Sequence, residues 1–189
     1  MDYKIILASN SPRRRELLKG LDIDFEVRII PGIDESHPAD TPPEEIPAFI
    51  AQKKADAYRA TIKEDELIIT ADTIVILDGD ILEKPVDKND AIKMIKRLSG
   101  RKHQVITAVA LTTTEWSKVF SVESKVDFAE LTNIEIEYYV DKYKPFDKAG
   151  AYGIQEWIGY IGVKSIEGSF YNVMGLPIQR LYQELKNLP

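Results

Sequence analysis

The chain has 189 residues, of which 44% are hydrophobic and 30% charged, and 25 basic against 31 acidic residues give a net charge of −6. This composition is typical of a soluble globular protein, and no apolar run reaches the roughly 20 residues that a membrane span needs. The lack of cysteine excludes disulfides and thiolate metal sites, and the acidic balance argues against general nucleic-acid binding. We therefore expect a cytoplasmic protein, without membrane or nucleic-acid partners, whose locally gathered basic residues serve a small anion.

The chain begins with an apolar strand over residues 3–7 that leads through a polar turn into a basic helix start. Ser11 is typical of a helix N-cap, and Pro12 suits the first helical position because its missing N–H costs nothing there. Arg13 and Arg14 follow at the positive end of the helix dipole, where cations are disfavoured unless an anion offsets them. The turn therefore predicts an anion site, although a solvated basic turn would carry the same residues and no glycine-rich nucleotide signature is present.

Strands and helices alternate through the rest of the chain. Patterning and turn residues predict a strand over 24–30, a helix over 48–60, a strand over 66–77 with a hairpin return through 81–82, a helix over 87–98, paired strands over 105–113 and 119–128, and a helix over 132–143. Glycines at 159, 162, 168 and 175 predict short strands and turns before a closing helix over 177–188. One hairpin and one long antiparallel pair indicate an α/β protein with a mixed sheet, in a single domain over 1–189 or in two lobes around one cleft.

Asp72 is the residue that this pattern singles out. It lies in the middle of the apolar run 66–77, where an unpaired carboxylate would be expensive, so we expect it to be paired or to coordinate a ligand. Glu35, beside Asp34 in the loop after the second strand, would by itself be part of an ordinary polar loop. Lys53, on the predicted helix beside Lys54, would by itself be a solvated helix edge.

Together these groups match what a metal-bound polyphosphate requires. Mg²⁺ is held by one or two carboxylates plus substrate phosphates, which suits Glu35 and Asp72, while arginines and lysines neutralise the remaining charge. His37 and His103 each lack a partner at ligand spacing, so a surface position or a hydrogen-bonded structural role is expected for both.

Eight blocks of the sequence resemble, in order, those of the Maf family of nucleoside triphosphate pyrophosphatases. They are LASNSPRRRELL at 7–18, DE at 34–35, KKA at 53–55, ADTIV at 71–75, EKP at 83–85, LSG at 98–100, KAGAYGIQ at 148–155 and NVMGLP at 172–177. The resemblance covers nearly the whole chain. It implies a mixed α/β fold with flanking helices and a deep central cleft, similar to the inosine triphosphate pyrophosphatases. It also implies hydrolysis of a nucleoside triphosphate to the monophosphate and pyrophosphate, a divalent cation (Mg²⁺ or Mn²⁺) and a homodimer.

The resemblance also implies roles for individual residues. The residues it assigns to substrate phosphates are Ser9, Arg13, Arg14, Lys53 and Lys84. Glu35 and Asp72 would hold the metal, with Asp72 also the catalytic base.

The block at 148–155 resembles the branch of the family that acts on dTTP and UTP, in which Arg13, Thr73 and Gln155 would set specificity. Glu156 and Trp157 depart from that branch, many members of which have glycine after the glutamine. A purine or modified nucleotide as substrate, and a nucleotide-sensing role in cell division, are the alternatives. Asp72 argues against a pure sensor, because a sensor needs cations for phosphate but no base.

Overall fold

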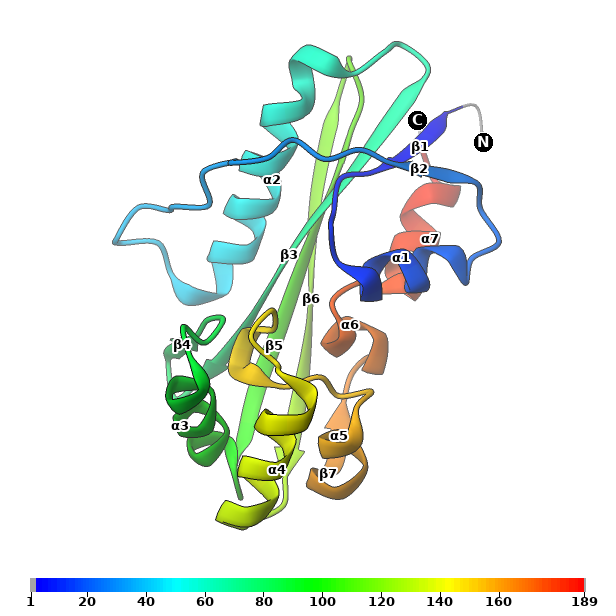
Figure 1. The fold of residues 1–189 in the computed structure, drawn as a ribbon. Helices are drawn as coiled ribbons and strands as arrows, with labels where there is room; N and C mark the ends of the chain where they lie inside the picture. The colour runs from blue at the N-terminus through cyan, green and yellow to red at the C-terminus, as the bar shows by residue number, and fades with distance from the viewer. Residues whose placement is uncertain (1–2, 189) are drawn as a thin grey trace. The chain divides into compact units, whose positions relative to one another are not determined.

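The computed structural model describes residues 3–188 (Figure 1). Its strands are β1 (Lys4–Leu7), β2 (Phe25–Val27), β3 (Glu66–Leu77), β4 (Asp80–Leu82), β5 (Lys102–Thr112), β6 (Ser117–Phe128) and β7 (Val163–Glu167). Its α-helices are α1 (Pro12–Lys19), α2 (Ile46–Tyr58), α3 (Lys88–Leu98), α4 (Asn133–Tyr143), α5 (Trp157–Gly162), α6 (Phe170–Met174) and α7 (Ile178–Lys186).

The strands form one seven-stranded sheet in the order β2-β1-β3-β5-β6-β7, with β4 also paired to β3. β1 runs parallel to both β2 and β3, whereas β4 is antiparallel to β3 and β7 is antiparallel to β6. In this register Leu7 lies opposite Ile69, so the turn after β1 emerges beside the middle of β3. The sheet is therefore mixed and flanked by helices, which confirms the predicted fold class.

Local sequence signals explain several element boundaries. The Ser11 side chain accepts a hydrogen bond from the Arg14 backbone N–H at 3.4 Å, which caps α1, and Pro12 occupies the first position of that helix. Asp78 and Gly79 both have positive φ, of 53° and 87°, which is the geometry of a tight turn between β3 and β4. The helix predicted to start at Thr132 is also confirmed, with a capping box between Thr132 and Glu135.

The prediction that glycines 159, 162, 168 and 175 divide this region into short strands and turns was correct for β7 and wrong for α5 and α6, which are helical. Gly159 lies inside α5 rather than at a turn, and it serves close packing. A Cβ added there would lie 1.7 Å from the carbonyl oxygen of Ile154. The second strand is also shorter than the predicted 24–30, since β2 covers only Phe25–Val27.

The chain divides into two compact units. Unit 1 comprises the chain up to Asp72, Thr107–Val122 and the chain from Gly175 onward, and unit 2 comprises Thr73–Ile106 and Glu123–Met174. The strands β3, β5 and β6 contribute residues to both units, and the division falls in β3 directly after Asp72.

In unit 1, small side chains allow α2 to lie close to the sheet. Ala51 and Ala55 of α2 form a buried cluster with Ala108 and Ala110 of β5. The Thr70 hydroxyl of β3 donates a hydrogen bond to the carbonyl oxygen of Ala51 at 2.7 Å, which ties the helix to that strand. The following turn of α2 is thereby held beside the middle of β3.

In unit 2, the rings of His103, Phe128 and Tyr152 pack edge to face against one another. The ring centroids of His103 and Phe128 lie 5.1 Å apart, and those of His103 and Tyr152 lie 5.4 Å apart. A hydrogen bond of 2.6 Å joins His103 Nε2 to the Tyr152 hydroxyl, and both side chains are buried. His103 therefore has the structural role that the sequence predicted, and it anchors the segment that carries Tyr152.

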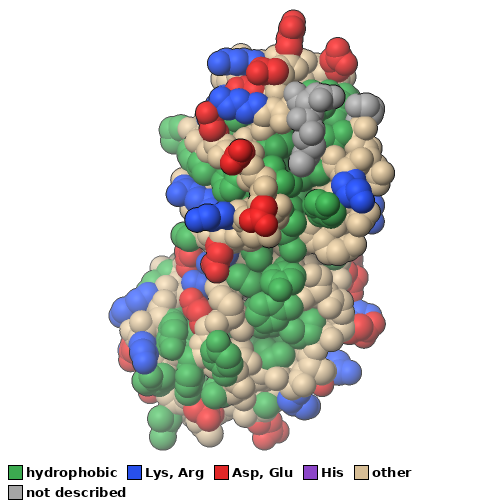
Figure 2. Space-filling model, turned by 90° about the vertical axis from the view of Figure 1, so that its right-hand side faces the viewer, with side chains coloured by type: hydrophobic (Ala, Val, Ile, Leu, Met, Phe, Trp, Pro, Cys, Tyr) green, Lys and Arg blue, Asp and Glu red, His purple; other side chains and the backbone are tan. Residues whose placement is uncertain are grey.

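The surface carries mixed charges. On the face shown in Figure 2, acidic and basic side chains are interspersed, and hydrophobic side chains also reach the surface. None of the helices within residues 3–188 has the length and apolar character that a membrane crossing requires.

Burial of His103 predicts a specific loss of stability in mild acid. Burial lowers the pKa of His103 from 6.5 to about 4, so the folded state binds this proton less readily than the unfolded state. Stability is therefore lost as the pH falls from 6.5 towards 4, by about 2–3 kcal/mol at pH 4.5. His103→Gln, which retains a hydrogen-bonding partner for Tyr152, should lose most of this dependence. Urea unfolding at pH 7 and pH 4.5 measures it, and an equal pH dependence in the variant would contradict the assignment.

Candidate active site

The Arg14 guanidinium joins three segments of unit 1. Its Nε donates to the carbonyl oxygen of Gly175 at 2.8 Å, and its Nη1 donates to the carbonyl oxygen of Ala71 at 2.9 Å and to Ser9 Oγ at 3.5 Å. Ser9 is itself buried, and its hydroxyl also accepts from the backbone N–H of Ser11 at 3.2 Å. The turn after β1 is therefore fixed against β3 by the same arginine that the sequence assigned to phosphate binding.

Neighbouring charges shift the pKa of Arg14 in opposite directions. Burial lowers the pKa of Arg14 below its ordinary value, and the neighbouring charge of Arg13 lowers it further, while Asp72 and Glu35 raise it. A guanidinium in such surroundings remains charged. Arg13 lies half-buried beside it in the first turn of α1, so two positive charges stand at this helix N-terminus.

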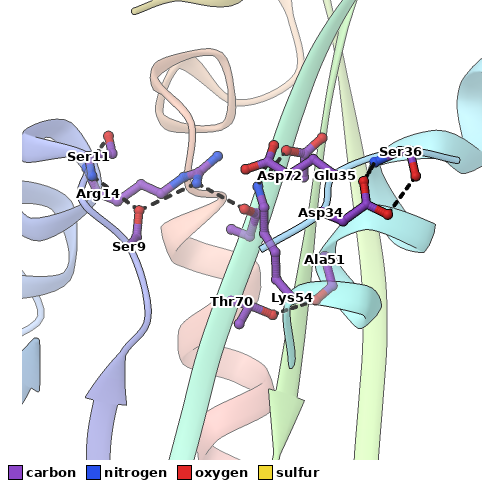
Figure 3. Close-up of polar contacts among 11 residues, drawn as sticks. Ser9, Ser11, Arg14, Asp34, Glu35, Ser36, Ala51, Lys54, Thr70 and Asp72 are labelled. Carbon is purple, nitrogen blue, oxygen red and sulfur yellow. Dashed lines mark hydrogen bonds and ion pairs between the residues drawn. The ribbon is translucent and has the colours of Figure 1, made fainter. Parts of the chain in front are cut away.

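Asp72 and Glu35 converge on the ammonium group of Lys54. Lys54 Nζ lies 2.9 Å from Asp72 Oδ1 and 3.2 Å from Glu35 Oε2, as Figure 3 shows. The side chains of Lys54 and Asp72 are only 15% and 12% exposed, so each charge depends on the other for compensation. The expectation that the carboxylate in the strand must be paired is therefore met by Lys54.

Lys53 has different partners. Its Nζ donates to Asp34 Oδ2 at 2.6 Å and to the carbonyl oxygen of Ser36 at 2.8 Å. Hydrogen bonds from Lys53 and Ser36 hold the pKa of the Asp34 carboxyl well below its usual range. In this structure Lys53 thus orders the loop after Ile33, and that loop carries Glu35.

The helical wheel of α2 explains why Lys54, which sequence reasoning passed over, reaches Asp72. At about 100° per residue, Lys54 falls within the arc of the buried residues Ile50, Ala51, Ala55 and Tyr58. Lys53 falls outside that arc. The wheel was available from the sequence, and it would have distinguished the two lysines.

The other candidates belong to unit 2. Thr73 follows Asp72 in β3 and is half-buried, and Lys84 is exposed in the loop after β4. Gln155 is half-buried, and its Oε1 is a buried acceptor with no hydrogen-bond partner among residues 3–188. A buried acceptor of this kind is costly unless a ligand satisfies it.

The carboxylates in unit 1 fit a divalent metal ion. Within residues 3–188 no three His, Cys, Asp or Glu side chains are grouped to hold a metal by themselves. Mg²⁺, however, is commonly bound by one or two carboxylates together with substrate phosphates. Glu35 and Asp72 already face a single cation, the Lys54 ammonium, so their donor chemistry and convergence suit such an ion.

A mixed sheet that presents a strand carboxylate among cations and a second carboxylate defines an α/β protein with the parts of a phosphoryl-transfer site. The family model described as Maf-like protein matches residues 4–188. The chain therefore belongs to the Maf family, as its motifs predicted.

Individual relatives agree with this assignment. A dTTP/UTP pyrophosphatase from Bacteroides thetaiotaomicron is 63% identical, with 98% of this chain and 96% of that protein covered. A second, from Parabacteroides distasonis, is 62% identical over the same shares. Among solved structures, the Ham1 protein of Staphylococcus aureus has a TM-score of 0.55 and 20% identity, covering 96% of this chain and 99% of its own, which is a likeness of fold.

The geometry predicts that Lys54 contributes more than Lys53 to binding a polyphosphate. Lys54→Met would leave Asp72 and Glu35 uncompensated, so the affinity for tripolyphosphate should fall by roughly 10- to 100-fold, as expected for a lost charge-assisted hydrogen bond. Lys53→Met is the matched control, because it removes the same group one residue away and should change the affinity much less. Calorimetric titration at one fixed Mg²⁺ concentration measures both. Equal losses of affinity in the two variants would show that Lys53 binds phosphate, as the motif resemblance implied.

Proposed function

We propose that this protein hydrolyses dTTP and UTP to their monophosphates and pyrophosphate. The observation that carries the proposal is the cluster of Asp72, Lys54, Glu35 and Arg14, in which a carboxylate in a buried strand is held among cations. The names of the relatives at 62–63% identity support the same activity. Family membership also makes a nucleoside triphosphate the expected substrate.

Asp72 is the proposed general base. It would accept a proton from water as the water oxygen bonds to the α-phosphorus. The bond from that phosphorus to the bridging oxygen of the β-phosphate then breaks, and pyrophosphate leaves with the bridging oxygen. A positioned carboxylate in this role contributes roughly 10²- to 10⁴-fold to the rate.

The cations of the chain would hold the phosphates. We assign Ser9, Arg13, Arg14, Lys54 and Lys84 to substrate phosphates, with Lys54 added because of its place beside Asp72. Lys53, which the motif resemblance also assigned to phosphate, is instead proposed to hold the loop that carries Glu35. Arginine suits this task, since its planar fork matches phosphate oxygens. Glu35 and Asp72 would hold a divalent metal ion, which when bound would neutralise charge on the triphosphate.

Gln155 is proposed to read the base. Its buried Oε1 can accept a hydrogen bond, and the N3–H of thymine or uracil is a donor of matching character. Cytosine lacks that proton and would leave two acceptors facing each other. Arg13 and Thr73 are proposed as further specificity residues on the motif resemblance. Guanine also presents a ring N–H donor at N1, so the same acceptor makes GTP the second candidate substrate.

A nucleotide panel tests the proposed function. Pyrophosphate release should be fastest from dTTP and UTP, slower from CTP and GTP, and lost in excess chelator, because two carboxylates repel a polyphosphate unless a cation lies between them. Asp72→Asn tests the general base, because the amide is nearly isosteric with the carboxylate. This variant should lower kcat by roughly 10² to 10⁴ while the substrate still binds. Full turnover in chelator, or parental rates in the variant, would contradict the mechanism. Preference for GTP would favour the second candidate.

Gln155→Ala should weaken the preference for dTTP and UTP over CTP. Loss of the acceptor removes a hydrogen bond that only the N3–H of thymine or uracil can donate, which amounts to about 1–3 kcal/mol of selectivity. The change should come chiefly from slower turnover of the two favoured substrates. The measurement is kcat/KM for the three nucleotides in the parent and the variant. An unchanged ratio would show that Gln155 does not read the base.

A further inference from the structure

The residue after Gln155 joins a hydrogen-bonded network in unit 2. The Glu156 carboxylate accepts a hydrogen bond from the Tyr139 hydroxyl of α4 and forms an ion pair with Lys148, whose Nζ lies 3.2 Å from Glu156 Oε1. The Tyr139 hydroxyl in turn accepts a hydrogen bond from the backbone N–H of Gly153 at 2.9 Å. Glu156 is thus connected to the start of the 148–156 segment, to its middle and to a neighbouring helix.

Gln155 lies inside the turn that this network closes. The backbone N–H of Glu156 donates to the carbonyl oxygen of Gly153 at 3.0 Å, so Gln155 is the third residue of a four-residue turn. Both end residues of the turn, Gly153 and Glu156, are bound to the Tyr139 hydroxyl. The backbone that carries the Gln155 side chain is therefore fixed on both sides by one tyrosine.

The space around the turn is filled. A Cβ added to Gly153 would lie 2.9 Å from Lys148 Cε and 3.0 Å from the Glu156 carboxyl carbon. Lys148 and Glu156 are only 10% and 19% exposed as side chains, so neither charge is well solvated without the other. Asp147 supplies a second carboxylate to Lys148, with its Oδ1 at 3.0 Å from Nζ.

Glu156 is also the N-cap residue of α5, but its side chain makes no capping hydrogen bond to that helix. The carboxylate is turned instead towards Tyr139 and Lys148. A helix N-terminus favours a capping carboxylate, so this orientation gives up one stabilising interaction for another. The alternative partners are the ones that fix the Gln155 turn.

We propose that Glu156 is a positioning residue for base selection, which holds the Gln155 acceptor in the orientation that meets the base through Tyr139 and Lys148. This inference rests on the proposed function of Gln155. A neutral acceptor discriminates between bases only if its direction is fixed, because a mobile amide can rotate to offer its NH₂ group to cytosine. The network fixes the backbone from which the Gln155 side chain extends, and so limits where its amide can lie.

The test combines selectivity with hydrogen exchange. In Glu156→Ala and in Tyr139→Phe, the ratio of kcat/KM for UTP to that for CTP should fall roughly tenfold towards the value of Gln155→Ala, as expected when a buried polar group is no longer held against its partner. Glu156→Gln, whose amide oxygen can still accept from Tyr139, should retain more of the ratio. In the double variant Gln155→Ala/Glu156→Ala the ratio should fall no further than in Gln155→Ala alone. Glu137→Ala, at an exposed carboxylate on α4, is the control and should leave the ratio unchanged.

Amide hydrogen exchange gives a readout that does not depend on turnover. Exchange at Gly153 and through residues 153–156 should quicken in Glu156→Ala relative to Glu137→Ala. Unchanged exchange in Glu156→Ala would overturn the role of Glu156. Faster exchange would overturn it too if the UTP to CTP ratio stayed the same in Glu156→Ala but fell in Gln155→Ala. A uniform loss of kcat/KM for every nucleotide would likewise reduce Glu156 to a stabilising residue. If the proposed function itself is wrong, the parent enzyme will release no pyrophosphate from dTTP or UTP. The exchange measurement then still decides whether Glu156 orders the turn.

Discussion

A carboxylate in the middle of a buried strand must be compensated, and the arrangement of unit 1 follows from that constraint. Asp72 lies in β3 with Lys54 Nζ at 2.9 Å, while Arg14 is bound to the carbonyl oxygen of the preceding residue, Ala71. One cation comes from α2 and the other from α1. Because a buried charge without a partner is strongly destabilising, the two helices that supply these cations are tied to the same point of the sheet.

Close apolar packing of α2 against the sheet allows Lys54 to reach Asp72. A lysine side chain must span from its helix to the strand, so α2 has to lie close to the sheet. The alanines at 51 and 55 allow that approach, and the hydrogen bond from Thr70 to the Ala51 carbonyl sets the position of the helix along the strand. Thr70 and Asp72 alternate with Ala71 along β3 and therefore point to the same side of the sheet. The side that anchors α2 is thus also the side that receives Lys54.

Much of the fold and part of the site could be predicted from the sequence, because these features depend on local signals. The bounds of β3, the start of α1 at Pro12 and the special character of Asp72 follow from periodicity, capping and the cost of burying charge. What failed depends on contacts that residue type and periodicity do not show. Gly159 is required by the Ile154 carbonyl rather than by a turn, and the partners of Glu156 are set by how α4 packs. The choice between Lys53 and Lys54 was predictable from the helical wheel, whereas their different partners depend on the loop that carries Glu35.

Recognition of phosphate and recognition of a base place different demands on the protein. Phosphate is bound by charge, which acts over several ångströms and tolerates small displacements, so flexible lysines and arginines suffice for it. A base differs from its competitors only in which ring atoms carry protons, and this difference is read by neutral hydrogen bonds that weaken steeply when misaligned. A base-reading amide therefore needs a backbone fixed more firmly than that of a phosphate-binding lysine. The hydrogen bonds of the Tyr139 hydroxyl with Gly153 and Glu156 fix the backbone on both sides of Gln155, as such a residue would require.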